Sequence, residues 1–143
     1  MFALYNRQAQ EEVFGKQPYM IAPGALAPKG VATPVEGGYR VTGRWEWGTG
    51  VMHSDWAMVG ALTPVEGSDT QDLCMYMLPR DQIEVIDTWN VAGMVATGSN
   101  DIAVDDVFIP EHMKESIATI RDGTSAGAKW LDRPVYKMPM LPV

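Results

Sequence analysis

Residues 39–47 read Tyr39-Arg40-Val41-Thr42-Gly43-Arg44-Trp45-Glu46-Trp47, and this stretch decides the fold. Its side chains alternate, with the tyrosine, the valine and both tryptophans on one face and the charged residues and the threonine on the other. That alternation is typical of a β-strand with one buried face. Similar stretches follow at hairpin-like spacing, separated by short turns, at residues 55–62, 72–78, 82–89 and 101–109. Short strands without helices between them must close on one another, so the sequence predicts a mainly β fold, an antiparallel β-barrel.

The residues before this strand are less regular. Residues 1–15 combine helix formers with apolar side chains and end at Gly15, so we expect the end of a helix there. From Gln17 to Gly38, prolines and glycines recur at a density that disfavours a helix and predicts an extended, turning loop. A loop of that length is often functional when it is ordered.

The residues after 113 show no sustained periodicity. A weak helical turn is expected around Ile117 and Ile120, and an apolar, proline-rich stretch runs to residue 143. This stretch has no core of its own to enter. We therefore expect it to dock on another domain or subunit, or to lead to one outside this chain.

Composition limits the class of protein. The 143 residues are 46% hydrophobic and 20% charged, which suits one folded core and argues against disorder. A net charge of -7 disfavours nucleic acid and anionic membranes as partners, and no stretch approaches the roughly 20 apolar residues of a membrane span. A single cysteine, Cys74, fits a cytoplasmic protein without an internal disulfide. With only 2 histidines in addition, we expect no metal site.

The richest chemistry lies in residues 43–50, followed by His53 and Trp56. The tryptophans supply flat apolar area, and the Gly48-Thr49-Gly50 turn offers backbone N–H groups beside a hydroxyl. This combination suits a planar heteroaromatic ring with polar edges. From residue types alone, an aromatic core strand that ends in a glycine turn remains the alternative, with Thr49 merely capping that turn.

The order of residues carries a family resemblance. The chain resembles the middle region of the acyl-CoA dehydrogenase superfamily, most closely its flavin-dependent monooxygenase branch. That branch includes the oxygenase components of p-hydroxyphenylacetate hydroxylase and of a secosteroid phenol hydroxylase. The segments that carry the resemblance are residues 2–5 and 9–15, 26–32, 37–45, 87–94, 97–102 and 104–110.

The resemblance implies a division of this chain. Proteins of the superfamily have an N-terminal helical domain, a middle β-barrel that binds flavin, and a C-terminal helical bundle that carries much of the tetramer contact. On that plan, residues 1–15 are the end of the first domain and residues 16–113 are the middle barrel. Residues 114–143 are then a linker toward a helical bundle that this chain lacks.

The resemblance also implies a site. The family's turn of an aromatic residue, any residue, and then Ser or Thr falls on Trp47-Gly48-Thr49, followed here by Gly50. The ring of Trp47 then flanks the isoalloxazine, and the hydroxyl of Thr49 approaches flavin N5. Flavin N5 and the neighbouring carbonyl gain electron density on reduction, so a donor fixed on a rigid turn would stabilise the reduced flavin or its oxygen adduct.

Two further parts of the site are expected. The loop at residues 21–30 corresponds to the segment whose backbone lines the flavin, and Ala25 and Ala27 are small enough for close approach. The acidic-Pro-Gly-Ala-Gly-Ser-Asp pattern of acyl-CoA dehydrogenases is absent here, which weakens the reading as a dehydrogenase. His53 is a candidate acid–base group, with a structural role as its alternative.

The function implied is the flavin-binding portion of the oxygenase component of a two-component aromatic hydroxylase. It would use O2 and reduced FMN, or FAD, delivered by a separate flavin reductase, and would act on a phenol-type small molecule within a homotetramer. We expect the isolated chain to be inactive, because one wall of a cavity cannot exclude water. Two alternatives stay open: the middle domain of an acyl-CoA dehydrogenase-like FAD oxidoreductase, and a non-enzymatic β-barrel interaction module.

Overall fold

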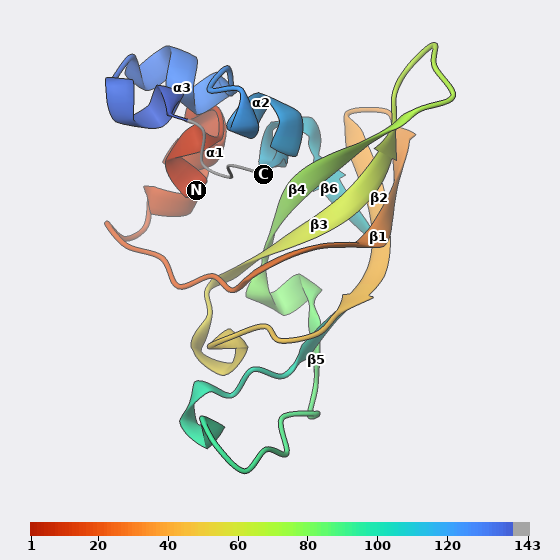
Figure 1. Ribbon diagram of the computed structural model, residues 1–143, viewed down its shortest axis with the longest axis vertical. Coiled ribbons are helices and arrows are strands. Elements are labelled where there is room, and N and C mark those ends of the chain that lie inside the picture. The colour runs from red at the N-terminus through yellow and green to blue at the C-terminus, as the bar shows by residue number, and fades with distance from the viewer. Residues whose placement is uncertain (139–143) are drawn as a thin grey trace.

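A single sheet forms the centre of the fold (Figure 1). The computed structural model describes residues 1–138, so the last part of the proline-rich stretch expected to dock elsewhere lies outside the described residues. Seven strands pair in the order β5-β6-β2-β1-β3-β4-β7. The strands are β1 (Gly24–Val35), β2 (Gly38–Trp45), β3 (Trp56–Pro64), β4 (Gln71–Pro79), β5 (Glu84–Ile86), β6 (Asp101–Pro110) and β7 (Lys114–Ser116). The prediction of a mainly β fold is confirmed.

The strand pairing differs from the predicted antiparallel barrel in two ways. Strands β5 and β7 are the two edges of the sheet and do not pair with each other, so a closed barrel is not confirmed. Strands β1 and β3 are parallel, whereas all other neighbours are antiparallel. The reason is the connection after β2, which crosses to the far side of β1 and places β3 there, running opposite to β2.

Strand β1 lies where the sequence predicted a loop, and that prediction was wrong. Its prolines are tolerated because the pairing with β3 shifts register between Ala25 and Gly30, and Pro28 lies inside that irregular stretch. Pro34 lies near the end of the strand, opposite Tyr39. A strand with a register shift accommodates a residue that cannot donate a hydrogen bond.

The predicted alternation of β2 is confirmed up to Trp45. Val41 and Trp45 are buried, and Thr42 and Arg44 between them are exposed. The indole of Trp45 has 0% exposure, and its Nε1 donates to the carbonyls of Gly60 at 2.8 Å and Ala27 at 3.1 Å. A Cβ added to Gly30 would come within 2.3 Å of the ring. Trp45 therefore packs against the glycine of a neighbouring strand and ties β1, β2 and β3 together.

The helices gather at one end of the sheet (Figure 1). They are α1 (Arg7–Phe14), α2 (Ile117–Arg121) and α3 (Ala126–Leu131), so a helix before Gly15 and a turn near Ile117 are confirmed. Helix α1 begins at Asn6, whose side chain accepts a hydrogen bond from Ala9 N at 2.9 Å. Gly127 of α3 lies so close to the N-terminal turn that an added Cβ would be 2.0 Å from Ala3 O. The N-terminal segment and the residues after β7 therefore pack on each other.

Single 3-10 turns complete the described elements. They are η1 (Phe2–Leu4), η2 (Val51–His53), η3 (Arg80–Gln82), η4 (Val95–Thr97), η5 (Glu111–Met113) and η6 (Pro134–Lys137). None of the helices between residues 1 and 138 has the length and apolar character that a membrane crossing requires.

Candidate functional site

The turn after β2 holds a tryptophan in a strained conformation. Trp47 has a φ of 66°, in the left-handed region, and its side chain is 73% exposed. A bulky residue in this region costs roughly 1–3 kcal/mol, and such residues cluster at functional sites. The placement of Trp47 on the buried face of β2 was therefore wrong, because the strand ends at Trp45 and the backbone then turns.

Backbone contacts fix this turn. The N–H of Gly48 donates to Asn100 O at 2.9 Å, and the N–H of Thr49 donates to Trp47 O at 2.8 Å. A Cβ on Gly48 would lie 2.8 Å from Ile102 Cδ1, so a side chain does not fit there. The side chain of Thr49 is exposed beside Trp47. The turn thus presents an indole and a hydroxyl to solvent on a fixed backbone.

A second segment, residues 87–100, packs beside the turn. The N–H of Gly50 donates to Thr97 O at 3.0 Å. Thr49 Oγ1 lies 3.0 Å from Ser99 Oγ, and Ser99 Oγ lies 2.9 Å from Thr97 Oγ1. The placement of these two hydroxyls beside Thr49 was not predicted from the sequence. The hydroxyl-rich run Thr97-Gly98-Ser99 was the available signal, but nothing in the sequence pairs it with Thr49.

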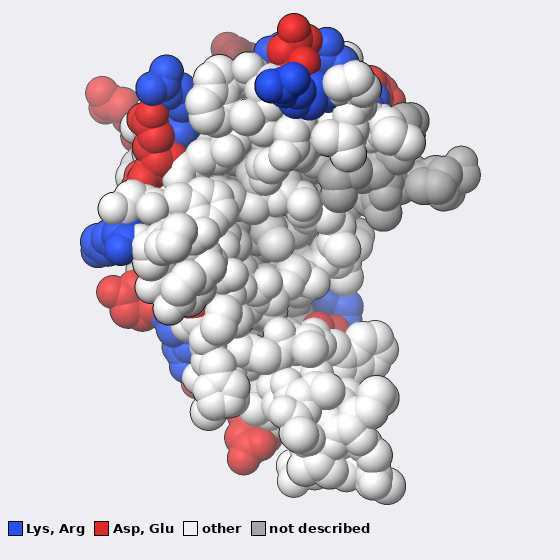
Figure 2. Space-filling view, turned by 90° about the vertical axis from the view of Figure 1, so that its left-hand side faces the viewer, with Lys and Arg blue, Asp and Glu red and all other residues white. Residues whose placement is uncertain are grey.

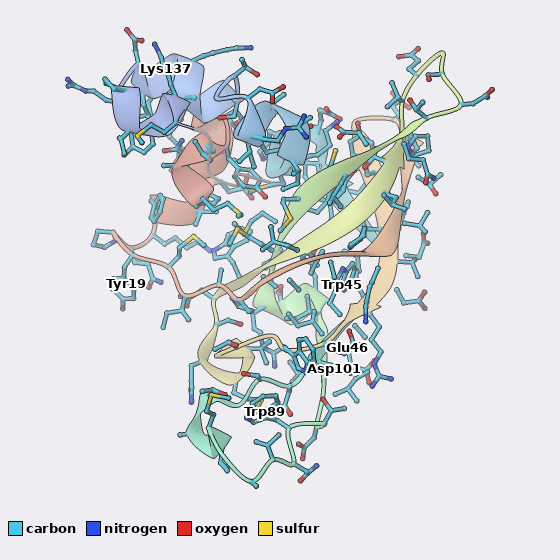
Figure 3. All side chains as sticks on the ribbon, in the orientation of Figure 1. Tyr19, Trp45, Glu46, Trp89, Asp101 and Lys137 are labelled. Carbon is cyan, nitrogen blue, oxygen red and sulfur yellow. The ribbon has the colours of Figure 1, made fainter. Side chains whose placement is uncertain are left out.

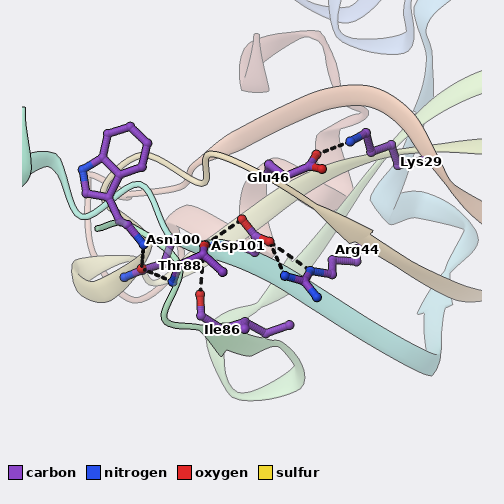
Figure 4. A network of polar contacts seen from close by, with 8 residues as sticks. Lys29, Arg44, Glu46, Ile86, Thr88, Asn100 and Asp101 are labelled. Carbon is purple, nitrogen blue, oxygen red and sulfur yellow. Dashed lines mark hydrogen bonds and ion pairs between the residues drawn. The ribbon is translucent and has the colours of Figure 1, made fainter. Parts of the chain in front are cut away.

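A polar network anchors that segment to the sheet (Figure 4). Asn100 Oδ1 accepts hydrogen bonds from the N–H groups of Thr88 and Trp89, both at 3.0 Å. Asp101 accepts from Thr88 Oγ1 at 2.9 Å and from the Arg44 guanidinium at 2.7 and 2.9 Å. Asp101 is buried and paired, so its charge costs less than an isolated one would. Figure 3 shows Trp89 in this segment at the lower end of the molecule, below Trp45.

Exposed apolar side chains surround the turn. Besides Trp47, the two segments expose Met52, Met94 and Val95. In Figure 2, the lower end of the molecule, formed by these segments, carries few charged side chains on the face shown. An exposed apolar area of this kind commonly marks a binding site.

The other predicted site residues lie differently. Ala25 is buried in the core beside Val59, and the carbonyl of Ala27 accepts from Trp45. His53 is exposed on η2, and its backbone N–H donates to Gly50 O at 3.0 Å. The structure thus brings Trp47, Gly48, Thr49 and Gly50 together on one turn with His53 directly after it. The two alanines belong to strand β1.

Two surface pockets lie elsewhere. One of about 670 Å³ lies between α1 and the turn at residues 79–82, and one of about 540 Å³ is lined by Tyr39, Cys74 and Lys114, among others. Burial raises the pKa of Cys74 to about 11, so its thiol is not a nucleophile at neutral pH. Among residues 1–138, no three acidic, histidine or cysteine side chains are placed to hold a metal ion.

The chain is thus a mainly β protein in which the turn after β2 displays the ring of Trp47 and the hydroxyl of Thr49. No protein-family model matches the sequence. Among its relatives, the flavin-dependent monooxygenase oxygenase subunit HsaA of Mycobacterium tuberculosis is 39% identical over 96% of this chain and 34% of its own length.

Two solved structures are similar. The crystal structure of 3-HSA hydroxylase from Rhodococcus sp. RHA1 superposes with a TM-score of 0.89 at 37% identity, over 97% of this chain and 36% of that protein. XiaF from Streptomyces sp., in complex with FADH2 and glycerol, gives a TM-score of 0.74 at 37% identity, over 80% of this chain and 29% of that protein.

The relatives named here and their solved structures are flavin-dependent monooxygenase oxygenase components with an acyl-CoA dehydrogenase-like fold. They include the oxygenase components of a resorcinol hydroxylase and of p-hydroxyphenylacetate 3-hydroxylase. The chain spans about a third of the length of these relatives.

Proposed function

We propose that this chain is the flavin-binding portion of the oxygenase component of a two-component aromatic hydroxylase. The observation that carries the proposal is Trp47, whose indole is 73% exposed while its backbone is held in a left-handed conformation. Such strain persists only where surrounding contacts enforce it, as those from Gly48 and Thr49 do here. An exposed ring held in this way is suited to stack on a planar ligand.

The residues of the turn fit a flavin. Trp47 supplies a flat apolar face, and the Thr49 hydroxyl beside it supplies a polar atom for flavin N5. Bound reduced flavin supplies the chemistry that activates O2. This chain positions the ring and hydrogen-bonds its reactive edge, and His53 is a candidate for moving a proton nearby. Ala25 contributes only its backbone, since its side chain faces the core, whereas Ala27 is exposed on the same strand.

The partners follow from the same proposal. The flavin would be reduced FMN, with reduced FAD as the alternative, supplied by a separate reductase, and the substrate would be a phenol-type small molecule. This arrangement is supported by the relatives, which are oxygenase components or subunits of flavin-dependent hydroxylases. Because the turn is exposed and forms a single wall, the remaining walls would come from other parts of a homotetrameric oxygenase.

The domain division is proposed on the same basis. Residues 1–15 would close an N-terminal helical domain, residues 16–113 would form the flavin-binding domain, and residues 114–143 would lead to a C-terminal helical bundle. The chain's match to about a third of its relatives' length supports this division.

Anaerobic titration with reduced FMN and reduced FAD tests the proposal. We expect the chain to bind reduced flavin and Trp47→Ala to weaken binding roughly tenfold, because an aromatic contact contributes about 0.5–1.5 kcal/mol beyond its buried area. Trp130→Ala is the matched control, since Trp130 is 46% exposed on α3, in the helical cluster rather than at the turn. Absence of reduced-flavin binding, or equal effects of the two substitutions, would contradict the proposal.

A further inference from the structure

We propose that Ser99 and Thr97 are positioning residues that turn the proton of the Thr49 hydroxyl inward, so that Thr49 Oγ1 faces the ligand as a hydrogen-bond acceptor. The inference rests on the proposed function and adds which residues would make the site prefer the reduced form of the flavin. It follows from three hydroxyl groups and one carbonyl that lie in a row.

The row begins at a carbonyl. Thr97 Oγ1 lies 2.9 Å from Met94 O, and a carbonyl oxygen can only accept, so the Thr97 hydroxyl donates to it. Met94 O also accepts from the Thr97 N–H at 3.0 Å and from Trp89 Nε1 at 3.1 Å. The Thr97 hydroxyl must still donate to this carbonyl. If its proton pointed elsewhere, lone pairs of Thr97 Oγ1 and Met94 O would face each other at 2.9 Å.

The remaining directions follow one after another. Each hydroxyl has a single proton. Since the Thr97 proton points to Met94 O, the contact of 2.9 Å between Ser99 and Thr97 needs the proton of Ser99. The contact of 3.0 Å between Thr49 and Ser99 then needs the proton of Thr49. Thr49 Oγ1 is therefore left with free lone pairs and no proton to offer on its exposed side.

The contact between Thr49 and Ser99 is held in place by the burial of Ser99 and by the contacts of Asn100. Ser99 is 4% exposed, so water does not readily replace Thr49 as its partner. The next residue, Asn100, is held through its side chain by the N–H groups of Thr88 and Trp89, and its carbonyl accepts from Gly48. The segment that carries Ser99 and the turn that carries Thr49 are thus fixed to each other on both sides of the contact.

An acceptor at Thr49 Oγ1 distinguishes reduced from oxidised flavin. Reduced flavin carries a proton on N5 and can donate to an acceptor, whereas oxidised flavin presents a lone pair at N5. An acceptor facing a lone pair is repelled, and an acceptor facing an N–H forms a hydrogen bond. The row of hydroxyls therefore favours reduced flavin, which is the form that a separate reductase delivers.

The test compares dissociation constants for oxidised and reduced FMN, measured anaerobically on the full chain. In Ser99→Ala the Thr49 hydroxyl can rotate, and in Thr97→Val the proton of Ser99 can turn toward Thr49. We expect the preference for reduced over oxidised FMN to fall roughly three- to tenfold in both variants, the size of one hydrogen bond. Thr97→Ser keeps the hydroxyl and should keep the preference.

Ser68→Ala is the matched control, because Ser68 also forms a hydroxyl pair, with Thr70 at 2.9 Å, in the turn between β3 and β4. If the wild-type chain binds reduced FMN and Ser99→Ala leaves the preference unchanged, the inference is overturned and the proposed function stands. If the wild type binds neither form, the proposed function fails.

The inference has a second test that needs no flavin. Neutron diffraction on deuterated crystals locates the hydroxyl deuterium of Thr49, which we expect on the line to Ser99 Oγ. Deuterium of Ser99 directed at Thr49 would overturn the inference.

Discussion

Trp45→Phe is the sharpest test of the packing described above. The substitution keeps an aromatic ring but removes the indole N–H that donates to the carbonyls of Gly60 and Ala27. The net loss of hydrogen bonding is about 1 kcal/mol, and carbonyls left without a donor add about 1 kcal/mol more. The smaller ring leaves a gap beside Gly30 that a glycine cannot fill, which costs about 1 kcal/mol.

The expected total is about 3 kcal/mol, or a fall in Tm on the order of 10 °C for a chain of this size. Urea unfolding followed by far-UV circular dichroism measures the loss. Trp130→Phe is the control, because Trp130 is half exposed, and its loss should stay below about 0.5 kcal/mol. A Trp45→Phe loss no larger than that of the control would refute the assignment of Trp45 as the residue that ties three strands together.

Three further predictions concern other parts of the chain. Gly127→Ala should lower the free energy of unfolding by about 2 kcal/mol, because the added Cβ would lie 2.0 Å from Ala3 O. Gly93→Ala is the control and should have no such effect, because no heavy atom lies within 4 Å of its Cβ position. Equal urea midpoints of the two variants would contradict this prediction. Burial raises the pKa of Glu115 above its ordinary value of 4.5, so its contribution to stability is fully present below that value and is lost as pH rises through the raised pKa. Glu115→Gln should abolish this loss in urea unfolding at a series of pH values, and unchanged pH profiles of the two proteins would count against it. Cys74 should react with a thiol reagent at pH 8 only after unfolding in urea, since its pKa is about 11, and rapid labelling of the folded chain would show otherwise.

The sequence predicts β2 well because one face of that strand is buried, and burial imposes the alternation from Tyr39 to Trp45. It does not predict β1, because Pro28 and Pro34 are read as breakers unless the register shift and the position near the strand end are known. Tertiary pairing with two neighbouring strands overrides that local signal.

The site was predictable only in part. The sequence marked Trp47, Gly48, Thr49 and Gly50, and the structure places them on one exposed turn. The contact between Thr49 and Ser99 joins residues 50 positions apart. No local pattern encodes such a contact, because it depends on β6 pairing with β2.

The pairing of β2 with β6 has a consequence for synthesis. As the nascent chain leaves the ribosome, β2 can join β1 at once, but its other side stays open until residues 101–110 have emerged. Until then the backbone around Trp47 lacks the partner that Asn100 provides. The turn at residues 47–50 is thus among the last parts of the sheet to be completed. A chain arrested before Asp101 can pair β1 to β4 but lacks β6, which positions the partner of this turn.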